Sequence, residues 1–234
     1  MGRELGTIRH NRRMEVFQQP SGLPRYWDTW GMARLAISPD AKYVASSGDY
    51  LDHSTRVWDT RTYSPIALTV RDALFFSPEM LRFSPDGTCL ALAQPGVWLW
   101  RTGAGPASVQ KLVEPGTTIG AIAFSRDSRY LAAAVGALVR LWDLRSGNEV
   151  ASLRHAGVLT TLVYAVAFSS DGRYLATGSR DGYTRIWEVP EGREITRMSF
   201  NENAAQKLAF AAADKYLIAS GGRSLTFWLW RPDD

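Results

Sequence analysis

Two short motifs recur together along the chain, and their common period constrains the fold more than any other feature. The first motif carries a tyrosine or cysteine that recurs every 41 to 46 residues. Its five copies are residues 37–44, 83–90, 124–131, 168–175 and 210–217. The second motif carries a tryptophan that recurs every 42 to 45 residues, at Trp58, Trp100, Trp142, Trp187 and Trp230. Two motifs with one period predict a chain of similar structural units.

The unit over residues 163–198 shows what each copy can fold into. Turn signals separate its apolar runs, with a serine, an aspartate and a glycine in 169–172 and a glycine in 179–182. Such side chains bond their own backbone, and glycine permits a positive φ. Short β-prone runs separated by turns predict an all-β fold. The four expected strands are 163–168, 174–178, 183–187 and 194–198.

This unit resembles the WD-repeat family. The resemblance rests on Phe-Ser-x-Asp-Gly-x-Tyr-Leu and Arg-hydrophobic-Trp-Asp patterns, seen for example in residues 124–131 and 140–143. It covers nearly the whole chain except about residues 11–31. It implies that each repeat forms one four-stranded blade of a β-propeller.

The two ends of the chain suggest how the blades are counted. Residues 2–10 match 147–155 at a glycine, a glutamate, an arginine and a histidine, so the chain begins on a fourth strand. It ends on a third strand, at 227–230. We therefore predict an all-β, five-bladed β-propeller of four-stranded antiparallel blades, in which the N-terminal strand pairs with the open edge of the last blade.

The predicted organisation is a single domain over residues 1–234 with an insert at about 11–31. An alternative is that the chain is cut from a longer array, since rings of this family have seven blades more often than five. The predicted blades are 32–70, 78–113, 119–154, 162–199, and 206–230 plus 3–9.

The ending over residues 229–232 suggests a narrower family. Its Leu-Trp-Arg-Pro sequence resembles the last repeat of WD arrays in bacterial STAND-type signalling ATPases, where the array is regarded as a sensor. An ATPase part would lie outside this chain, because no Gly-x-x-x-x-Gly-Lys-Ser/Thr loop is present.

The resemblance also implies a polar tetrad inside a blade. In the family it joins a histidine, an aspartate, a serine or threonine, and a tryptophan, and it fixes the blade rather than reading a ligand. The fourth repeat has the complete set, with Thr177 or Ser179 in the hydroxyl position beside His155, Asp181 and Trp187. The other repeats keep the tryptophan without the histidine.

Candidate partner-binding residues lie in connections that depart from the repeat. The insert at 11–31 is rich in arginine and aromatic residues, the types enriched at interaction hot spots. Alternatively, the insert covers the ring with its own aromatics, and Phe76 belongs to strand packing. The candidates are Arg12, Arg13, Tyr26, Trp27, Trp30, Phe76, Tyr50 and Arg180.

The composition limits the classes of function. Three histidines and the absence of known catalytic motifs favour a non-enzymatic scaffold that binds a protein or peptide, without a cofactor. A hydrolase or lyase with a site at the channel mouth is one alternative. The net charge of +4 and pI of about 9.3 keep a nucleic-acid-binding propeller as another.

Cysteine use and hydropathy set the expected state of the protein. The single cysteine, Cys89, excludes an intrachain disulfide and is expected in the core. The loop 47–54 carries one histidine and two aspartates, and we expect no metal site there. No apolar run is long enough to span a membrane, and no secretory signal precedes the first repeat. We expect a cytoplasmic monomer, unless the ring closes between chains.

Overall fold

The structure is a computed structural model, and it places 21 β-strands, β1 to β21. It describes residues 17–18, 24–25, 32–48, 55–66, 80–93, 96–105, 108–155, 162–200 and 204–230. β1 (Phe17–Gln18) and β2 (Pro24–Arg25) form a small antiparallel pair. All other strands belong to five larger sheets, each of which joins strands in chain order.

The five sheets have the following strands. The first contains β3 (Met32–Ile37), β4 (Tyr43–Gly48), β5 (Thr55–Asp59) and β6 (Pro65–Ile66). The second contains β7 (Met80–Phe83), β8 (Cys89–Ala93), β9 (Val97–Arg101) and β10 (Gln110–Val113). The third contains β11 (Ile119–Phe124), β12 (Tyr130–Val135), β13 (Leu138–Asp143) and β14 (Asn148–Arg154). The fourth contains β15 (Val163–Phe168), β16 (Tyr174–Ser179), β17 (Tyr183–Glu188) and β18 (Glu194–Ser199). The fifth contains β19 (Lys207–Ala211), β20 (Tyr216–Gly221) and β21 (Ser224–Leu229).

The four strands expected over 163–198 are confirmed, and three of them end one residue later than predicted. The turn at 169–172 is held by its polar side chains and its glycine, as the residue types predict. The Ser169 hydroxyl donates to Asp171 at 2.6 Å and accepts from the backbone N–H of Tyr174 at 2.9 Å. Gly172 supplies the positive φ of 73° that closes the turn.

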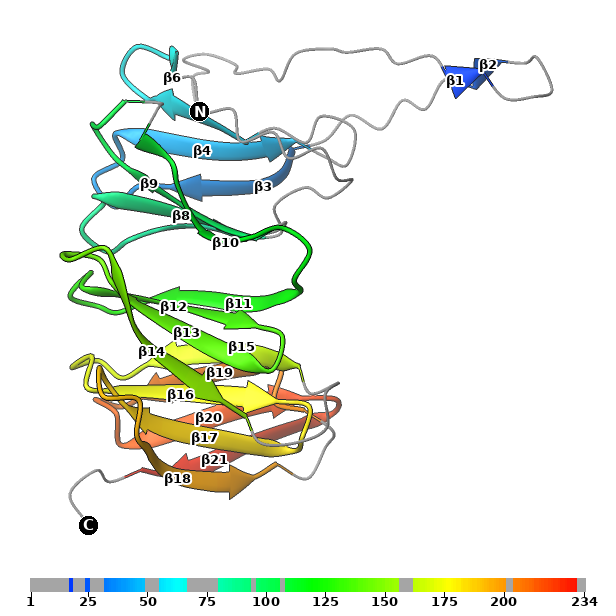
Figure 1. The fold of residues 1–234 in the computed structure, drawn as a ribbon, viewed down its shortest axis with the longest axis vertical. Coiled ribbons are helices and arrows are strands. Elements are labelled where there is room, and N and C mark those ends of the chain that lie inside the picture. The colour runs from blue at the N-terminus through cyan, green and yellow to red at the C-terminus, as the bar shows by residue number, and fades with distance from the viewer. Residues whose placement is uncertain are drawn as a thin grey trace, which may run out of the picture.

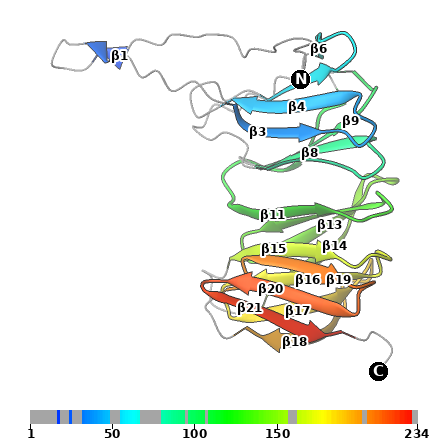
Figure 2. The same cartoon turned by 180° about the vertical axis from the view of Figure 1, so that it is seen from behind.

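The first, second and third sheets follow one another along the long axis of the molecule, and the fourth and fifth lie together at the end opposite the first (Figures 1 and 2). The first strands of successive sheets are in contact. At one such contact Gly120 of β11 lies against the backbone of β15. A Cβ at position 120 would come within 1.9 Å of the Val163 carbonyl oxygen, so only glycine allows this approach.

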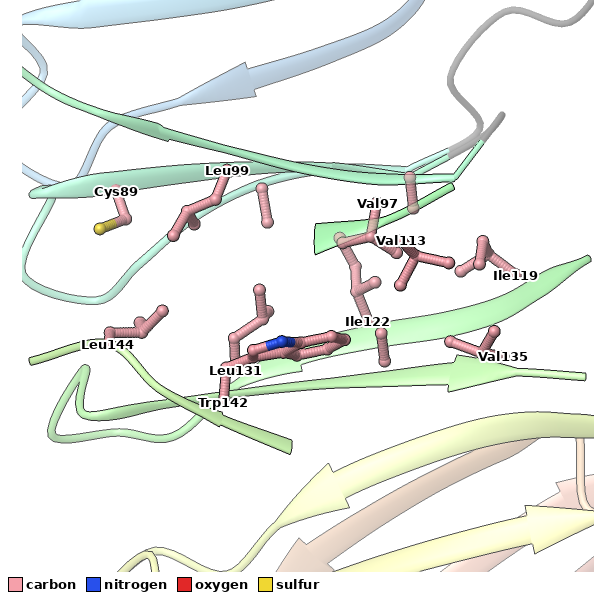
Figure 3. Close-up of a cluster of buried hydrophobic side chains, with 13 residues drawn as sticks. Cys89, Val97, Leu99, Val113, Ile119, Ile122, Leu131, Val135, Trp142 and Leu144 are labelled. Carbon is pink, nitrogen blue, oxygen red and sulfur yellow. The ribbon is translucent and has the colours of Figure 1, made fainter. Parts of the chain in front are cut away.

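Buried side chains from neighbouring sheets form the core. Between the second and third sheets, Leu99 and Val97 meet Ile122, Leu131 and Trp142 (Figure 3). Equivalent clusters lie between the first and second, the third and fourth, and the fourth and fifth sheets. Because side chains alternate along a strand, each interior sheet buries one face against the preceding sheet and the other against the following one.

The strand ends and turns of every sheet lie on two opposite sides of the stack. We call the side on which β3, β7, β11, β15 and β19 begin the strand-start edge, which is distinct from the edge strands of the sheets. The turns between second and third strands lie at this edge, and hydrogen bonds link it from sheet to sheet, as from the Val163 N–H to the Gly136 carbonyl at 2.9 Å. The first turn of each sheet, such as 169–172, lies at the opposite edge.

The all-β, antiparallel, four-stranded prediction is confirmed for four of the five sheets. In the fifth sheet the structure describes three strands, and among the described residues β21 pairs only with β20. Residues 3–9, predicted to complete this sheet, lie outside the described residues. The blade count and ring closure therefore stay predictions.

The assignment of the last repeat's tryptophan was wrong by two residues. Trp142 lies opposite Leu131 and Trp187 lies opposite Leu175, but the residue opposite Leu217 is Trp228. Trp230, two residues further on, packs edge-on against Tyr174 of the fourth sheet, with ring centroids 5.4 Å apart, as Trp100 packs against Tyr43 of the first sheet at 5.9 Å. Residues two apart share a strand face, so the motif alone could not choose between the two tryptophans.

Candidate functional site

A buried polar network surrounds His155. This residue follows β14, at the connection from the third sheet to the fourth, and it is only 2% exposed. Its Nε2 lies 2.8 Å from the Thr177 hydroxyl, and its Nδ1 lies 2.9 Å from the Ser179 hydroxyl. Both hydroxyls come from β16, so this strand fixes the imidazole at two points.

Trp187 joins the network through Thr177. Its indole Nε1 donates to the Thr177 hydroxyl oxygen at 2.8 Å, and its ring lies beside the His155 imidazole with centroids 5.7 Å apart. The rest of the indole packs in the core between the third and fourth sheets. One threonine thus connects an apolar core residue to the polar network.

Asp181 and Arg185 complete the network with opposite charges. Arg185 Nη1 lies 2.6 Å from Asp181 Oδ2 and donates to His155 Nδ1 at 2.9 Å. The Ser179 hydroxyl donates to Asp181 Oδ1. The Arg185 side chain is 2% exposed, so this ion pair is held away from water. A buried charge is tolerated only with such a partner.

The surroundings of His155 keep its imidazole neutral. Arg185 Nη1 and the Ser179 hydroxyl each lie 2.9 Å from Nδ1, and the Thr177 hydroxyl lies 2.8 Å from Nε2. Burial, followed by the positive charge of Arg185, lowers the pKa of His155 to about 4, although Asp181 acts in the opposite direction. The imidazole is therefore neutral at neutral pH and acts as a structural connector.

The structure brings together all members of the predicted tetrad. Both hydroxyls left open by the sequence take part, since Thr177 bonds Trp187 and Ser179 bonds Asp181. Sequence reasoning missed the role of Arg185. A signal was available, because an arginine stands two residues before the tryptophan in the first, third and fourth repeats.

The first sheet retains part of the same arrangement. The Trp58 indole donates to the Ser46 hydroxyl at 3.0 Å, and Ser46 lies beside Arg56 on the neighbouring strand. In the third sheet Ala133 stands beside Arg140, where the fourth sheet has Thr177 beside Arg185. Arg140 instead donates through Nε to Glu149 at 3.0 Å. Among the described residues the full network is seen in the fourth sheet, while Ser46, Arg56 and Trp58 of the first sheet take part in further interactions.

The recurring aspartates of the first motif have structural partners. In each of four repeats a serine hydroxyl donates to the aspartate two residues later, at 2.6 to 2.7 Å. These aspartates are Asp40, Asp86, Asp127 and Asp171. At Asp40, hydrogen bonds from Ser38 and then Lys42 lower the pKa to about 2. The repeated carboxylates thus hold turns and are not grouped for acid–base chemistry.

Of the partner-binding candidates, only Arg180 lies within the described residues. It is exposed in the turn between β16 and β17, and its backbone N–H donates to the Leu162 carbonyl at 2.8 Å. The candidates outside the described residues are Arg12, Arg13, Tyr26, Trp27, Trp30, Tyr50 and Phe76.

Cys89 provides a direct check on whether this chain carries an accessible nucleophile. Its side chain is buried in the core between the second and third sheets, and burial raises the pKa of its thiol. We expect less than about one tenth of this thiol to react with Ellman's reagent in the folded protein under conditions that label it fully in denaturant. Rapid labelling of folded protein would contradict the burial of Cys89.

Within the part of the chain that the structure describes, no three His, Cys, Asp or Glu residues are grouped as metal ligands. The loop 47–54, which carries His53, lies mostly outside it. The same part of the chain contains no helix that is long and apolar enough to cross a membrane.

These features define an all-β repeat protein of stacked antiparallel sheets. The family described as WD domain, G-beta repeat, matches residues 30–59, 107–143 and 147–188. The match identifies these segments as WD repeats and confirms, over these segments, the resemblance inferred from the motifs. The resemblance of residues 229–232 to arrays of STAND-type ATPases stays a prediction. A comparison with curated proteins finds no match.

Proposed function

We propose that this chain is a non-catalytic scaffold that binds another protein or peptide along its strand-start edge. The proposal rests on one observation: the strands that flank the candidate residues in sequence all begin or end on the same side of the stack. The insert leads into β3, position 50 separates β4 from β5, position 76 precedes β7, and Arg180 separates β16 from β17. All these strand ends belong to one edge of the stack.

Arg180 illustrates how this edge can present a side chain. Its turn is tied to the beginning of β15 by the backbone bond to Leu162, and Asp181 beside it belongs to the buried network. The arginine is therefore displayed from a rigid position. Rigid presentation lowers the entropy lost on binding, and arginine and aromatic residues are enriched at hot spots.

The family match supports a binding role rather than catalysis. WD repeats generally serve as protein-interaction scaffolds. The polar residues that recur in this chain hold turns or form the buried network, and His155 within that network is only 2% exposed. A sensor role within a larger signalling chain would be one use of such a scaffold, and rests on the resemblance of residues 229–232.

The proposal is tested by comparing charge reversal at the two edges. The probe is a lysate of the source organism, passed over immobilised protein, with retained proteins quantified by mass spectrometry. We expect wild type to retain a stoichiometric protein, and Arg180→Glu and the Trp27→Ala/Trp30→Ala double variant to reduce it at least about tenfold, as for hot spots. Arg145→Glu is the matched control, because Arg145 is equally exposed in a turn at the opposite edge.

Three outcomes would contradict the proposal. Equal retention by all variants would exclude the strand-start edge. Loss with Arg145→Glu alone would move the surface to the other edge. Retention that disappears with nuclease, and falls steeply between 50 and 200 mM salt, would instead favour a nucleic-acid-binding propeller, because phosphate contacts release counterions.

A further inference from the structure

The fifth sheet has an apolar face that is exposed in this chain. Leu225, Phe227 and Leu229 alternate along β21 and are 60%, 60% and 55% exposed. Ile218 of β20 lies beside Phe227 on the same face. We call these four residues the tail face. A monomer seldom leaves so many large apolar side chains together in water without a partner.

The repeat shows what normally covers this face. Pairing registers make Phe227 equivalent to Ile186 in the fourth sheet and Leu141 in the third, since each lies opposite the second residue after the motif tyrosine. Ile186 and Leu141 are fully buried, because the following sheet packs on them. The tail face is therefore the surface on which a following sheet docks.

The first sheet exposes the complementary surface. Leu35 and Ile37 of β3 are 56% and 58% exposed, and we call them the head face. Ile37 precedes a turn serine, as do Phe83 and Phe124, which pack against the preceding sheet. Leu35 corresponds to Ile122, which is 3% exposed. The head face is therefore the surface that docks on a preceding sheet.

The positions of the two faces show whether a tail face can meet the head face of its own chain or that of a second copy. The first and fifth sheets lie at opposite ends of the stack (Figures 1 and 2). Bringing them together within one chain would require the four buried clusters between successive sheets to be rearranged. A second copy can reach the tail face with no such change.

We propose that the tail face of one copy binds the head face of a second copy, so that two chains continue the stack across their junction. The contact reproduces the packing between successive sheets, of which Figure 3 shows an example. It is heterologous, because different surfaces meet, and it produces a closed ring or a longer series according to the rotation between copies.

The test uses single charges placed in each face of the full chain. Wild type is examined by sedimentation velocity and light scattering from about 1 to 100 μM, a span suited to weak interfaces. We expect its mass to rise with concentration to at least twice the 26.0 kDa of one chain. Ile37→Asp, which alters the head face, and Phe227→Asp, which alters the tail face, are each expected to remain monomeric.

Mixing the two variants distinguishes the proposed contact from a general loss of association. Ile37→Asp retains an intact tail face and Phe227→Asp retains an intact head face, so an equimolar mixture should form a dimer that grows no further. Val150→Asp is the control, because Val150 is exposed on β14, away from both faces, and it should associate like wild type. Circular dichroism and thermal melting establish that each variant is folded.

Several results would overturn the proposal. Wild type that stays at 26.0 kDa over the whole range would exclude a second copy as occupant. Association that only Phe227→Asp abolishes would indicate two tail faces in contact, and a mixture that remains monomeric would contradict the head-to-tail contact. If either variant unfolds, the milder Ile37→Ser and Phe227→Ser changes replace them in the same mixing experiment.

Discussion

Replacing Arg185 with leucine is expected to lower the free energy of unfolding by about 3–5 kcal/mol, the cost of breaking a buried ion pair from one side. Arg185 Nη1 lies 2.6 Å from Asp181 Oδ2, and both side chains are shielded from solvent. Leucine fills part of the space but leaves the carboxylate without its cation. The change is measured by urea denaturation followed by tryptophan fluorescence and circular dichroism.

A double-mutant cycle separates the ion pair from simple packing. Asp181→Asn removes the carboxylate charge, so the Arg185→Leu/Asp181→Asn variant should lose less stability than the sum of the single variants. Arg180→Leu is the matched surface control and should change stability by no more than about 0.5 kcal/mol. Additive losses would show that Asp181 and Arg185 are not coupled, and the network described around His155 would then be wrong.

The strands could be predicted from the sequence because their signals are local. Turn residues such as Ser169 and Gly172 define where a strand ends, and the apolar runs between turns define where it lies. The expected strands over 163–198 agree with β15 to β18 to within one residue. Ring closure is different, because it depends on how small rotations between sheets add along the whole stack.

The tetrad was predicted from resemblance, but its charge balance was not. His155 and Trp187 occupy recognisable positions in the repeat. An arginine at position 185 of the third strand is equally compatible with a side chain exposed to solvent. Only the pairing of Arg185 with Thr177 across β16 and β17 places its guanidinium beside both His155 and Asp181. A tertiary contact of this kind has no signature in spacing alone.

The exposed faces show a further limit of sequence patterns. Phe227 and Ile186 occupy equivalent places in the pairing registers of their strands, and both are large apolar residues. Their environments differ because a sheet follows β17 in the stack while none packs on β21 among the described residues. Alternation identifies which side chains share a face, and only the arrangement of sheets shows whether that face is covered.

Acidification from pH 6.5 to about 4 is expected to reduce stability by about 3 kcal/mol through His155 alone, at about 1.4 kcal/mol per unit of pKa difference. Burial and Arg185 lower the pKa of folded His155 from 6.5 to about 4. Between these values the unfolded chain binds a proton that the folded chain does not, so unfolding is favoured as pH falls. Well above pH 6.5 the imidazole is neutral in both states, and its contribution is constant.

The aspartates contribute little to the change in stability between pH 6.5 and 4.5. Hydrogen bonds from Ser38 and Lys42 lower the pKa of Asp40 to about 2, and hydrogen bonds from Ser179, Tyr183 and Arg185 lower that of Asp181 against the effect of burial. Their stabilising contributions are present above the ordinary aspartate pKa of 3.8 and are lost only as pH falls below it. A loss of stability between pH 6.5 and 4.5 therefore reports mainly on histidine.

His155→Gln isolates the contribution of this residue from those of the two other histidines, His10 and His53. The variant should be less stable at pH 7.5, because it loses bonds to Thr177 and Ser179, but its stability should change less between pH 6.5 and 4.5 than that of wild type. Denaturant midpoints across this range give both slopes, and equal slopes would refute the low pKa of His155.

Arg185→Leu adds an independent readout to the same experiment. Arg185 lowers the pKa of His155 and Asp181 raises it, so removing the guanidinium while keeping the carboxylate should raise this pKa. Histidine ring shifts followed by NMR should then show His155 titrating at higher pH than in wild type. An unchanged titration would mean that burial alone holds the imidazole neutral, and that the charge of Arg185 serves Asp181 rather than His155.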